Sequence, residues 1–212
     1  MIAIIDYKAG NLTSVKRALD SIGKESVITS DYNQIVEAGR VIFPGVGAAG
    51  QAINDLKTGR LDIALKEVFE AKKPVLGICL GTQIILEASQ ENNAECLGLV
   101  KGQVIKFPDN LRDINGRKLK VPHMGWNSVS IKYSHPLFEG VAPDSEFYFV
   151  HSYYPAPEDR DKILGETSYG ITFTSVIVSD NLVAMQFHPE KSGRPGLKIL
   201  ENFCNWSGKN NA

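Results

Sequence analysis

Cysteine is scarce in this chain of 212 residues, and neither sign of charge is in excess. Cys79, Cys96 and Cys204 are an odd set of three, which argues against a disulfide framework and for a reducing compartment where a thiolate can persist. The 23 basic and 24 acidic side chains give a net charge of −1. This balance does not indicate a surface for nucleic acid or a polybasic membrane patch, so we expect neither partner.

Long apolar runs and metal-binding spacings are missing as well. No run approaches the roughly 18 apolar residues of a membrane span, and the apolar start Met1–Ile5 is too short for a signal sequence. No Cys-x-x-Cys or histidine-rich spacing indicates a metal site. We therefore expect a cytoplasmic protein without metal or cofactor. The length and the absence of a linker favour a single domain over residues 1–212.

Strand and helix patterns alternate in the first half of the chain. Short β-rich runs occupy residues 2–5, 26–29 and 40–43, with Pro44 ending the third, and an apolar helical stripe runs from Leu12 to Ile22. This order implies parallel strands joined by right-handed crossovers. It predicts an α/β fold, namely a flavodoxin-like open, mostly parallel sheet with helices on both faces.

The second half has a different texture. Short β-type segments separated by turns follow one another, and we expect them to add antiparallel strands beside the parallel core rather than to form a second domain. A final helix is expected from about Ser192. The expected strands are residues 99–107, 118–121, 128–131, 147–150, 162–167, 171–178 and 182–187.

The segment Pro74–Gln83 has the layout of a nucleophile elbow. An apolar strand, Val75–Ile78, ends at Cys79, and a helical pattern follows to about Glu91. Glycines stand two positions before and two after the cysteine, so the chain can turn sharply and a substrate can approach. A helix N-terminus behind the sulfur favours thiolate over thiol. A small buried structural cysteine is the alternative that this segment alone leaves open.

A base and its orienting group are available downstream. His188 follows an apolar run, which places it at the carboxyl end of a strand, and Glu190 is on the same side if the chain stays extended, as Pro189 favours. The carboxylate can then hold one imidazole nitrogen while the other faces Cys79. Spacing alone leaves a satisfied, partly buried histidine as the alternative.

The segment Pro44–Gly50 contains three glycines between a strand and a helix. It lacks the lysine of a Walker motif and the spacing of GxGxxG. A phosphate cradle and a plain flexible loop remain open. The third interpretation is an oxyanion loop whose Val46–Gly47 peptide points its N–H into a neighbouring site, because such loops lie at the carboxyl edge of an open sheet.

Taken together, three motifs resemble those of the triad (class I) glutamine amidotransferases. They are residues 44–47, 77–83 and 188–190, in that order, and the likeness extends from about Ile2 to Trp206. The resemblance implies hydrolysis of the glutamine side-chain amide to glutamate and ammonia. It makes Cys79 the nucleophile, His188 the base and Glu190 its orienting carboxylate, with the oxyanion held at Val46, Gly47 and Leu80 and glutamine held by Gln83, Glu91, Ser152 and Tyr153.

Other segments resemble one branch of that family, whose glutaminase subunits form a heterodimer with a (β/α)8 cyclase. Residues 6–15, 122–127, 149–154 and 191–193 carry this likeness. It implies that ammonia passes through the cyclase barrel. Because Gly45 and Gly47 flank a peptide that can rotate at low cost, our hypothesis is that a nucleotide ligand on the cyclase turns the Val46–Gly47 peptide into its active orientation. The positions that match the interface are Asn11, Arg17, Met124, Trp126, Tyr148 and Lys191, and ordinary packing is the alternative for Met124 and Trp126.

Three other functions remain open at this point. The chain could be an amidotransferase subunit that feeds anthranilate, guanylate or pyridoxal phosphate synthesis, although residues 6–11 and 122–126 are not expected there. It could be a non-catalytic flavodoxin-like regulatory module, but we find no acidic pocket with a late lysine. An unrelated cysteine hydrolase of α/β type is the third.

Overall fold

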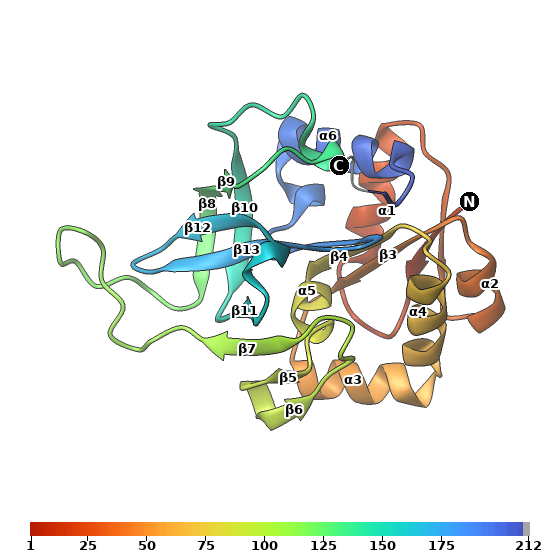
Figure 1. Ribbon diagram of the computed structural model, residues 1–212, viewed down its shortest axis with the longest axis horizontal. Helices are drawn as coiled ribbons and strands as arrows, with labels where there is room; N and C mark the ends of the chain where they lie inside the picture. Colours follow the sequence, from red (N-terminus) through yellow and green to blue (C-terminus); the bar gives the residue numbers. More distant parts are fainter. Residues whose placement is uncertain (210–212) are drawn as a thin grey trace.

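The computed structural model describes residues 1–209, and an eight-stranded sheet forms its centre (Figure 1). The first five strands across the sheet are mutually parallel, and the last three are antiparallel. The mostly parallel sheet with antiparallel additions is thus confirmed. In spatial order the strands are β2 (Ser26–Thr29), β1 (Ile2–Ile5), β3 (Arg40–Gly45), β4 (Val75–Cys79), β14 (Leu182–Met185), β13 (Thr172–Ser179), β12 (Ile163–Ser168) and β9 (Ser130–Ile131).

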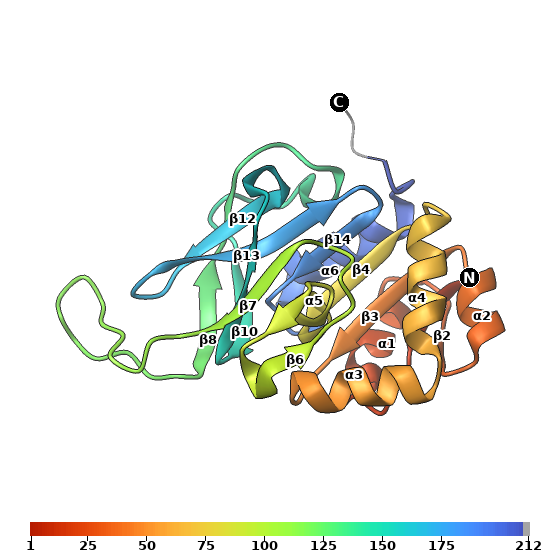
Figure 2. The ribbon, with the colours of Figure 1, turned by 60° about the horizontal axis from the view of Figure 1, so that its bottom comes forward.

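Helices cover both faces of this sheet (Figures 1 and 2). Alternation along the strands explains the two layers, because Ile4 packs into one apolar cluster while Ala3 and Ile5 pack into the other. Residues of α1 (Leu12–Ser21) and α6 (Gly193–Asn205) fill the first cluster; those of α2 (Tyr32–Glu37), α3 (Ala49–Thr58), α4 (Leu61–Glu70) and α5 (Leu80–Ile84) fill the second.

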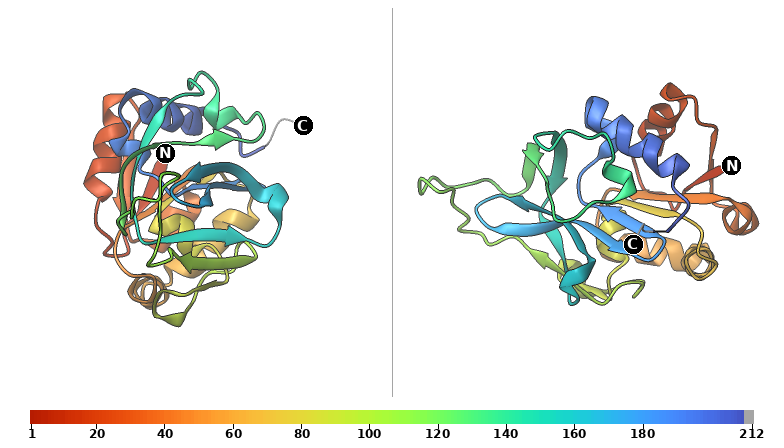
Figure 3. Two further views of the ribbon diagram at one scale, coloured as in Figure 1. Left: turned by 90° about the vertical axis from the view of Figure 1, so that its left-hand side faces the viewer. Right: turned by 45° about the horizontal axis from the view of Figure 1, so that its top comes forward.

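Residues 88–157 add two small sheets beside the main one (Figure 3). Strands β8 (His123–Ser128) and β10 (Glu146–His151) form an antiparallel pair. A four-stranded sheet has the order β11 (Tyr153–Pro157), β7 (Gly102–Lys106), β5 (Ala88–Ser89) and β6 (Ala94–Glu95). Among residues 1–209, four single-turn helices complete the fold, namely η1 (Glu91–Asn93), η2 (Pro136–Phe138), η3 (Arg160–Lys162) and η4 (Pro189–Lys191).

Several expected boundaries are wrong, each for a local reason. The helix after the elbow ends at Ile84 rather than near Glu91, because the chain turns into β5 and the carbonyls of Ile84 and Ile85 accept hydrogen bonds from residues 97, 99 and 100. Pro44 does not end β3: the pairing with β1 stops at Ile42, so the missing N–H of the proline leaves no ladder bond unmade.

Two expected strands of the second half also differ. Residues 118–121 form no strand, and Lys118 pairs with Arg112 in an isolated antiparallel bridge. The expected strand over residues 128–131 is divided: β8 begins earlier, at His123, and β9 is a separate short strand on the edge of the main sheet. The longest helix in residues 1–209, α6, has 13 residues, and no helix in that part of the chain could cross a lipid bilayer.

Candidate active site

Three neighbouring strand ends bring the predicted site together. Strand β4 lies between β3 and β14, with Gly45 opposite Cys79 and Met185 opposite Ile78. The loop after β3, the cysteine that ends β4 and the segment after β14 therefore meet at one carboxyl edge, where ligands bind in open α/β sheets. A pocket of about 300 Å³ opens there, lined by Val46, Gly47, Cys79, Leu80, Gln83, Glu91, Pro122, Val150, His151, Ser152 and Tyr153.

Cys79 occupies a strained position on a sharp turn. Its φ and ψ of 53° and −107° are unusual for a residue with a side chain, and it directly precedes α5. The neighbouring glycines make the turn possible: a Cβ on Gly81 would lie 1.9 Å from the carbonyl oxygen of Phe43, and one on Gly77 would lie 2.9 Å from Cβ of Ala184. The elbow that the sequence predicts is confirmed as a backbone geometry.

His188 and Glu190 form a buried ion pair. Nδ1 of His188 lies 2.7 Å from Oε1 of Glu190, and both side chains are sequestered from solvent. Burial lowers the pKa of His188, but its neighbours Cys79 and Glu190 outweigh it and raise that pKa to about 10. Nε2 makes no hydrogen bond within residues 1–209 and is the nitrogen left for Cys79. The imidazole is therefore cationic at neutral pH.

Asn11 lies inside the site rather than only on a partner face. Its Nδ2 donates a hydrogen bond to Oε1 of Glu190 and lies 3.4 Å from Nδ1 of His188. Its backbone is in the left-handed conformation, with φ of 75°, at the residue that precedes α1. The sequence did not predict this contact, because no local pattern links residue 11 to residues 188 and 190.

Two of the expected glutamine-binding residues also have partners within the chain. Oε2 of Glu91 accepts a hydrogen bond of 2.7 Å from the backbone N–H of Ala49 and so fixes the start of α3, just beyond the Val46–Gly47 loop. Nε2 of Gln83 donates to the carbonyl oxygen of Tyr153 at 2.9 Å. These contacts connect the pocket wall to the elements that carry the loop and β11.

Most of the expected interface residues lie on the surface beside the ion pair. The ring of Trp126 is edge-on to Tyr148 at 6.1 Å, and Nζ of Lys191 lies 6.0 Å from the centre of the Tyr148 ring. Met124 and Trp126 are 62% and 53% exposed, which is high for large apolar side chains. Arg17 is exposed on α1, which contacts η4. The carbonyl oxygen of Tyr148 accepts from the backbone N–H of His188, so this patch is continuous with the site.

A chain of two neutral histidines begins at the pocket wall, which His151 lines, and continues inward to His123. Nδ1 of His151 donates to the carbonyl oxygen of Tyr153 at 2.7 Å, which leaves its Nε2 to accept from Nδ1 of His123 at 3.0 Å. Nε2 of His123 then accepts from Asn127 at 3.3 Å. Burial lowers the pKa of His123 to about 4 and that of His151 to about 3. The sequence singled out neither imidazole, since their contact depends on strand pairing between β8 and β10.

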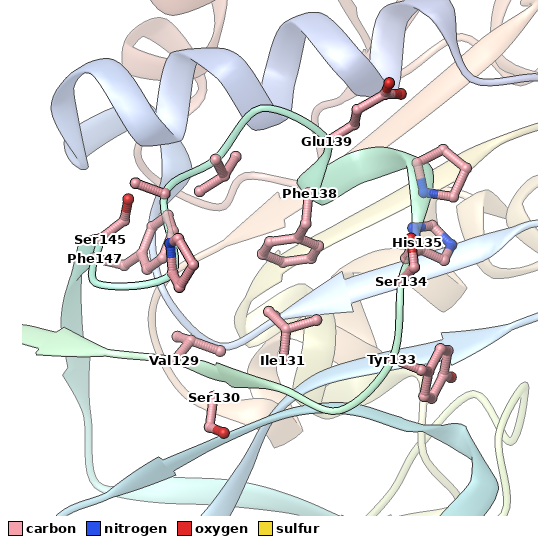
Figure 4. Close-up of a pocket in the computed structure, with 14 residues that line it drawn as sticks. Val129, Ser130, Ile131, Tyr133, Ser134, His135, Phe138, Glu139, Ser145 and Phe147 are labelled. Carbon is pink, nitrogen blue, oxygen red and sulfur yellow. The ribbon is translucent and has the colours of Figure 1, made fainter.

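A larger cavity lies elsewhere. It measures about 960 Å³ and is lined by residues 129–147 around β9 and η2, including Val129, Ile131, Phe138 and Phe147. Figure 4 shows Phe138 and Ile131 pointing toward each other across it. None of the expected catalytic, oxyanion or glutamine-binding residues lines this cavity, so its size does not mark the chemistry.

The model of the glutamine amidotransferase class-I family matches residues 3–206, and the chain belongs to that family. A curated relative from Maridesulfovibrio salexigens, named imidazole glycerol phosphate synthase subunit HisH, is 52% identical over 203 residues, which cover 96% of this chain and 95% of the relative. The protein of that name from Dehalococcoides mccartyi (strain CBDB1) is 45% identical over 204 residues, which cover 96% of each chain.

Solved structures share the fold at much lower identity. A glutamine amidotransferase crystal structure superposes with a TM-score of 0.73 at 15% identity and covers 96% of this chain and 100% of that one. PurLQS from Thermotoga maritima superposes with a TM-score of 0.73 at 15% identity, and the match covers 96% of this chain and 97% of that one. At this identity the similarity concerns the fold alone.

Proposed function

We propose that this protein is the glutaminase subunit of imidazole glycerol phosphate synthase and acts as one domain over residues 1–212 in the cytoplasm. It hydrolyses glutamine and supplies the ammonia to a cyclase in histidine biosynthesis. The observation that carries the proposal is the meeting of Cys79, the His188–Glu190 pair and the Val46–Gly47 loop at one strand edge. Relatives of that name, about half identical over nearly the whole chain, support the choice of pathway.

The proposed reaction proceeds in two halves. The Cys79 thiolate attacks the side-chain carbonyl carbon of glutamine, a C–S bond forms, and the oxyanion takes hydrogen bonds from the backbone N–H groups of Leu80 and Gly47. His188 gives its Nε2 proton to the leaving nitrogen, the C–N bond breaks and ammonia departs. His188 then takes a proton from water as the water attacks the thioester, the C–S bond breaks and glutamate leaves. Glu190 orients the imidazole and stabilises its cationic form throughout.

Gln83, Glu91, Ser152 and Tyr153 line the same pocket and are proposed to hold the amino-acid end of glutamine. The reaction needs no metal or cofactor, because the protein's own side chains supply the nucleophile, the acid and the base. Gly47 has a φ of 113° and no atom within 4 Å of where its Cβ would be. A glycine at this φ lets the Val46–Gly47 peptide turn at low cost, which fits a loop that a partner switches on.

The proposed partner is the (β/α)8 cyclase subunit, in a heterodimer. Ammonia released into neutral water becomes unreactive ammonium, so a covered route to the bound ribonucleotide is required to make imidazole glycerol phosphate and an aminoimidazole carboxamide ribotide. The exposed apolar pair Met124 and Trp126 has the composition of an interface core and lies beside the ion pair. Arg17, Tyr148 and Lys191 extend that patch, and Asn11 connects it to Glu190.

Measurement of glutamate release tests the proposal. The chain alone, the chain with the cyclase, and that pair with the cyclase's nucleotide ligand should show release that rises in this order. Cys79→Ala should abolish release and preserve docking, while Cys96→Ala, which changes a thiol outside the pocket, should leave both unchanged. Activity that survives Cys79→Ala would overturn the assignment. Equal release with and without the liganded cyclase would overturn the proposed loop switch.

Another amidotransferase pathway is the alternative that the fold does not exclude. It would be favoured if the cyclase failed to bind and the chain were activated by a different synthase. A glutamine-mimicking diazoketone should modify Cys79 in either case. No modification in the presence of the cyclase would instead favour a non-catalytic module or an unrelated hydrolase.

A further inference from the structure

Gln186 is a fully buried amide next to Cys79, and the reaction described above does not use it. It follows the last residue of β14 and stands two positions before His188, so both side chains belong to the strand end that borders β4. Nε2 of Gln186 lies 3.7 Å from Sγ of Cys79, within the range of an N–H···S hydrogen bond, and Oε1 accepts from Nε2 of Gln83 at 3.1 Å.

The direction of this amide is set by its neighbours. The backbone carbonyl oxygen of Tyr153 can only accept, so Gln83 must present its NH2 group there, at 2.9 Å. The same nitrogen lies 3.1 Å from the Gln186 side chain, which must therefore present its oxygen to Gln83. That leaves the NH2 group of Gln186 facing the sulfur. The assignment does not depend on telling nitrogen from oxygen within either glutamine.

A donor fixed in this position favours the charged form of the sulfur. A thiolate is a much stronger acceptor than a thiol, and hydrogen bonds to ions exceed those between neutral groups. The carbonyl oxygen of Val150 also lies near Sγ, at 3.9 Å, and it would accept from a thiol but repel a thiolate. Gln186 opposes that repulsion by donating to the sulfur.

We propose that Gln186 is a further catalytic residue, whose amide donates a hydrogen bond to the Cys79 sulfur whenever that sulfur carries negative charge. The proposal rests on the proposed function, in which the sulfur is charged twice. It is a thiolate before it attacks glutamine. It becomes a thiolate again when water adds to the thioester, the C–S bond breaks and the electron pair leaves with sulfur.

Alkylation of Cys79 by iodoacetamide as a function of pH tests this without glutamine or cyclase. The wild-type chain is compared with Gln186→Met, which keeps the length of the side chain and removes the donor. The pH midpoint for Cys79 should rise by about one unit or more, because a hydrogen bond to a charged group is lost. Peptide mass spectrometry reads Cys96 in the same sample, and its alkylation should not change. Gln103→Met, at an exposed position on β7, is the matched control.

Gln186→Glu keeps the shape and can still accept from Gln83, but it places a carboxylate beside the sulfur. Its midpoint should rise further than that of Gln186→Met. An unchanged midpoint in either folded variant overturns the proposal, and a lowered melting temperature with that unchanged midpoint assigns Gln186 to packing alone. Should the chain fail to release glutamate with any cyclase, the function proposed above would fall, whereas the alkylation midpoints would still report on Gln186 and the sulfur.

Discussion

Acid should weaken this fold through the buried pair His123 and His151. Both imidazoles have folded-state pKa values below the ordinary 6.5, about 4 for His123 and about 3 for His151, because burial disfavours the cation. Above pH 6.5 both are neutral in the folded and the unfolded chain, so their contribution to stability is intact. As the pH falls below 6.5, the unfolded chain binds protons that the folded chain refuses, and stability is lost until the folded-state values are reached.

The size of the loss follows from these values. His151 is 5% exposed, and its folded-state pKa of about 3 lies well below the ordinary 6.5. At about pH 4.5, two units below the ordinary value, His151 therefore lowers the unfolding free energy by about 2.7 kcal/mol, at about 1.4 kcal/mol per unit. His123 lowers the unfolding free energy by a similar amount, because its folded-state pKa of about 4 is also below pH 4.5. The sum, roughly 5 kcal/mol, is comparable to the whole unfolding free energy of many domains.

The double change His123→Phe with His151→Phe removes both titrations. In the double variant, Asn127 still donates a hydrogen bond to the carbonyl oxygen of Ser168. The carbonyl oxygen of Tyr153 still accepts one from Gln83, so both groups keep a partner. The imidazoles already lie among aromatic rings, so two further rings are tolerated there at a cost of roughly 1–3 kcal/mol that does not depend on pH. The double variant should therefore be somewhat less stable at neutral pH and much less sensitive to acid.

Urea unfolding at about pH 7 and about pH 4.5 measures this difference, since the slope of stability with pH reports bound protons. Fluorescence of Trp206, which is 3% exposed, reports the transition. The double variant should lose about 5 kcal/mol less than wild type between the two pH values. Phe203→Leu, in the core far from the pair in sequence, controls for a general loss of stability and should keep the wild-type pH dependence. An equal loss in the double variant and the wild type would refute the reasoning.

Three further predictions concern the elbow, the ion pair and the exposed patch. Gly81→Ala should lower the unfolding free energy by roughly 2–3 kcal/mol in urea titrations, because its Cβ would lie 1.9 Å from the carbonyl oxygen of Phe43. Glu190→Gln should lower the pKa of His188 and reduce glutamate release with the cyclase by about 100-fold, and near wild-type release would contradict an orienting role. Trp126→Ala should weaken cyclase binding in calorimetry by at least about tenfold without changing the melting temperature.

Local patterns were sufficient for much of the site. The run Val75–Ile78, stopped by Cys79 between two glycines, predicted the elbow because strand, turn and helix preferences there depend on adjacent residues. The contact between His188 and Glu190 was predicted for an extended chain, but residues Pro189–Lys191 form the single turn η4, and the contact is made from that turn. The strand–helix order of the first half predicted the parallel sheet.

The position of Gln186 near the site could have been predicted, because it stands two residues before His188 in the same run. Its hydrogen-bond partners could not be predicted from the sequence. Its amide bonds with Gln83 and Cys79 only because β14 lies directly beside β4. Local patterns also could not predict that the helix after the elbow is short. The backbone N–H groups of residues 97, 99 and 100 donate to the carbonyl oxygens that a longer helix would use for its own hydrogen bonds.

The sequence by itself thus determined the elements, the family likeness and the identity of the Cys79, His188 and Glu190 set. Only the tertiary structure decided which groups surround that set. Asn11 meets Glu190, and His123 meets His151, through pairings between segments far apart in the chain. Hydrogen-bond partners and pKa values depend on distances of a few ångströms in a desolvated interior. Such distances are set by strand register and packing, which short-range preferences do not encode.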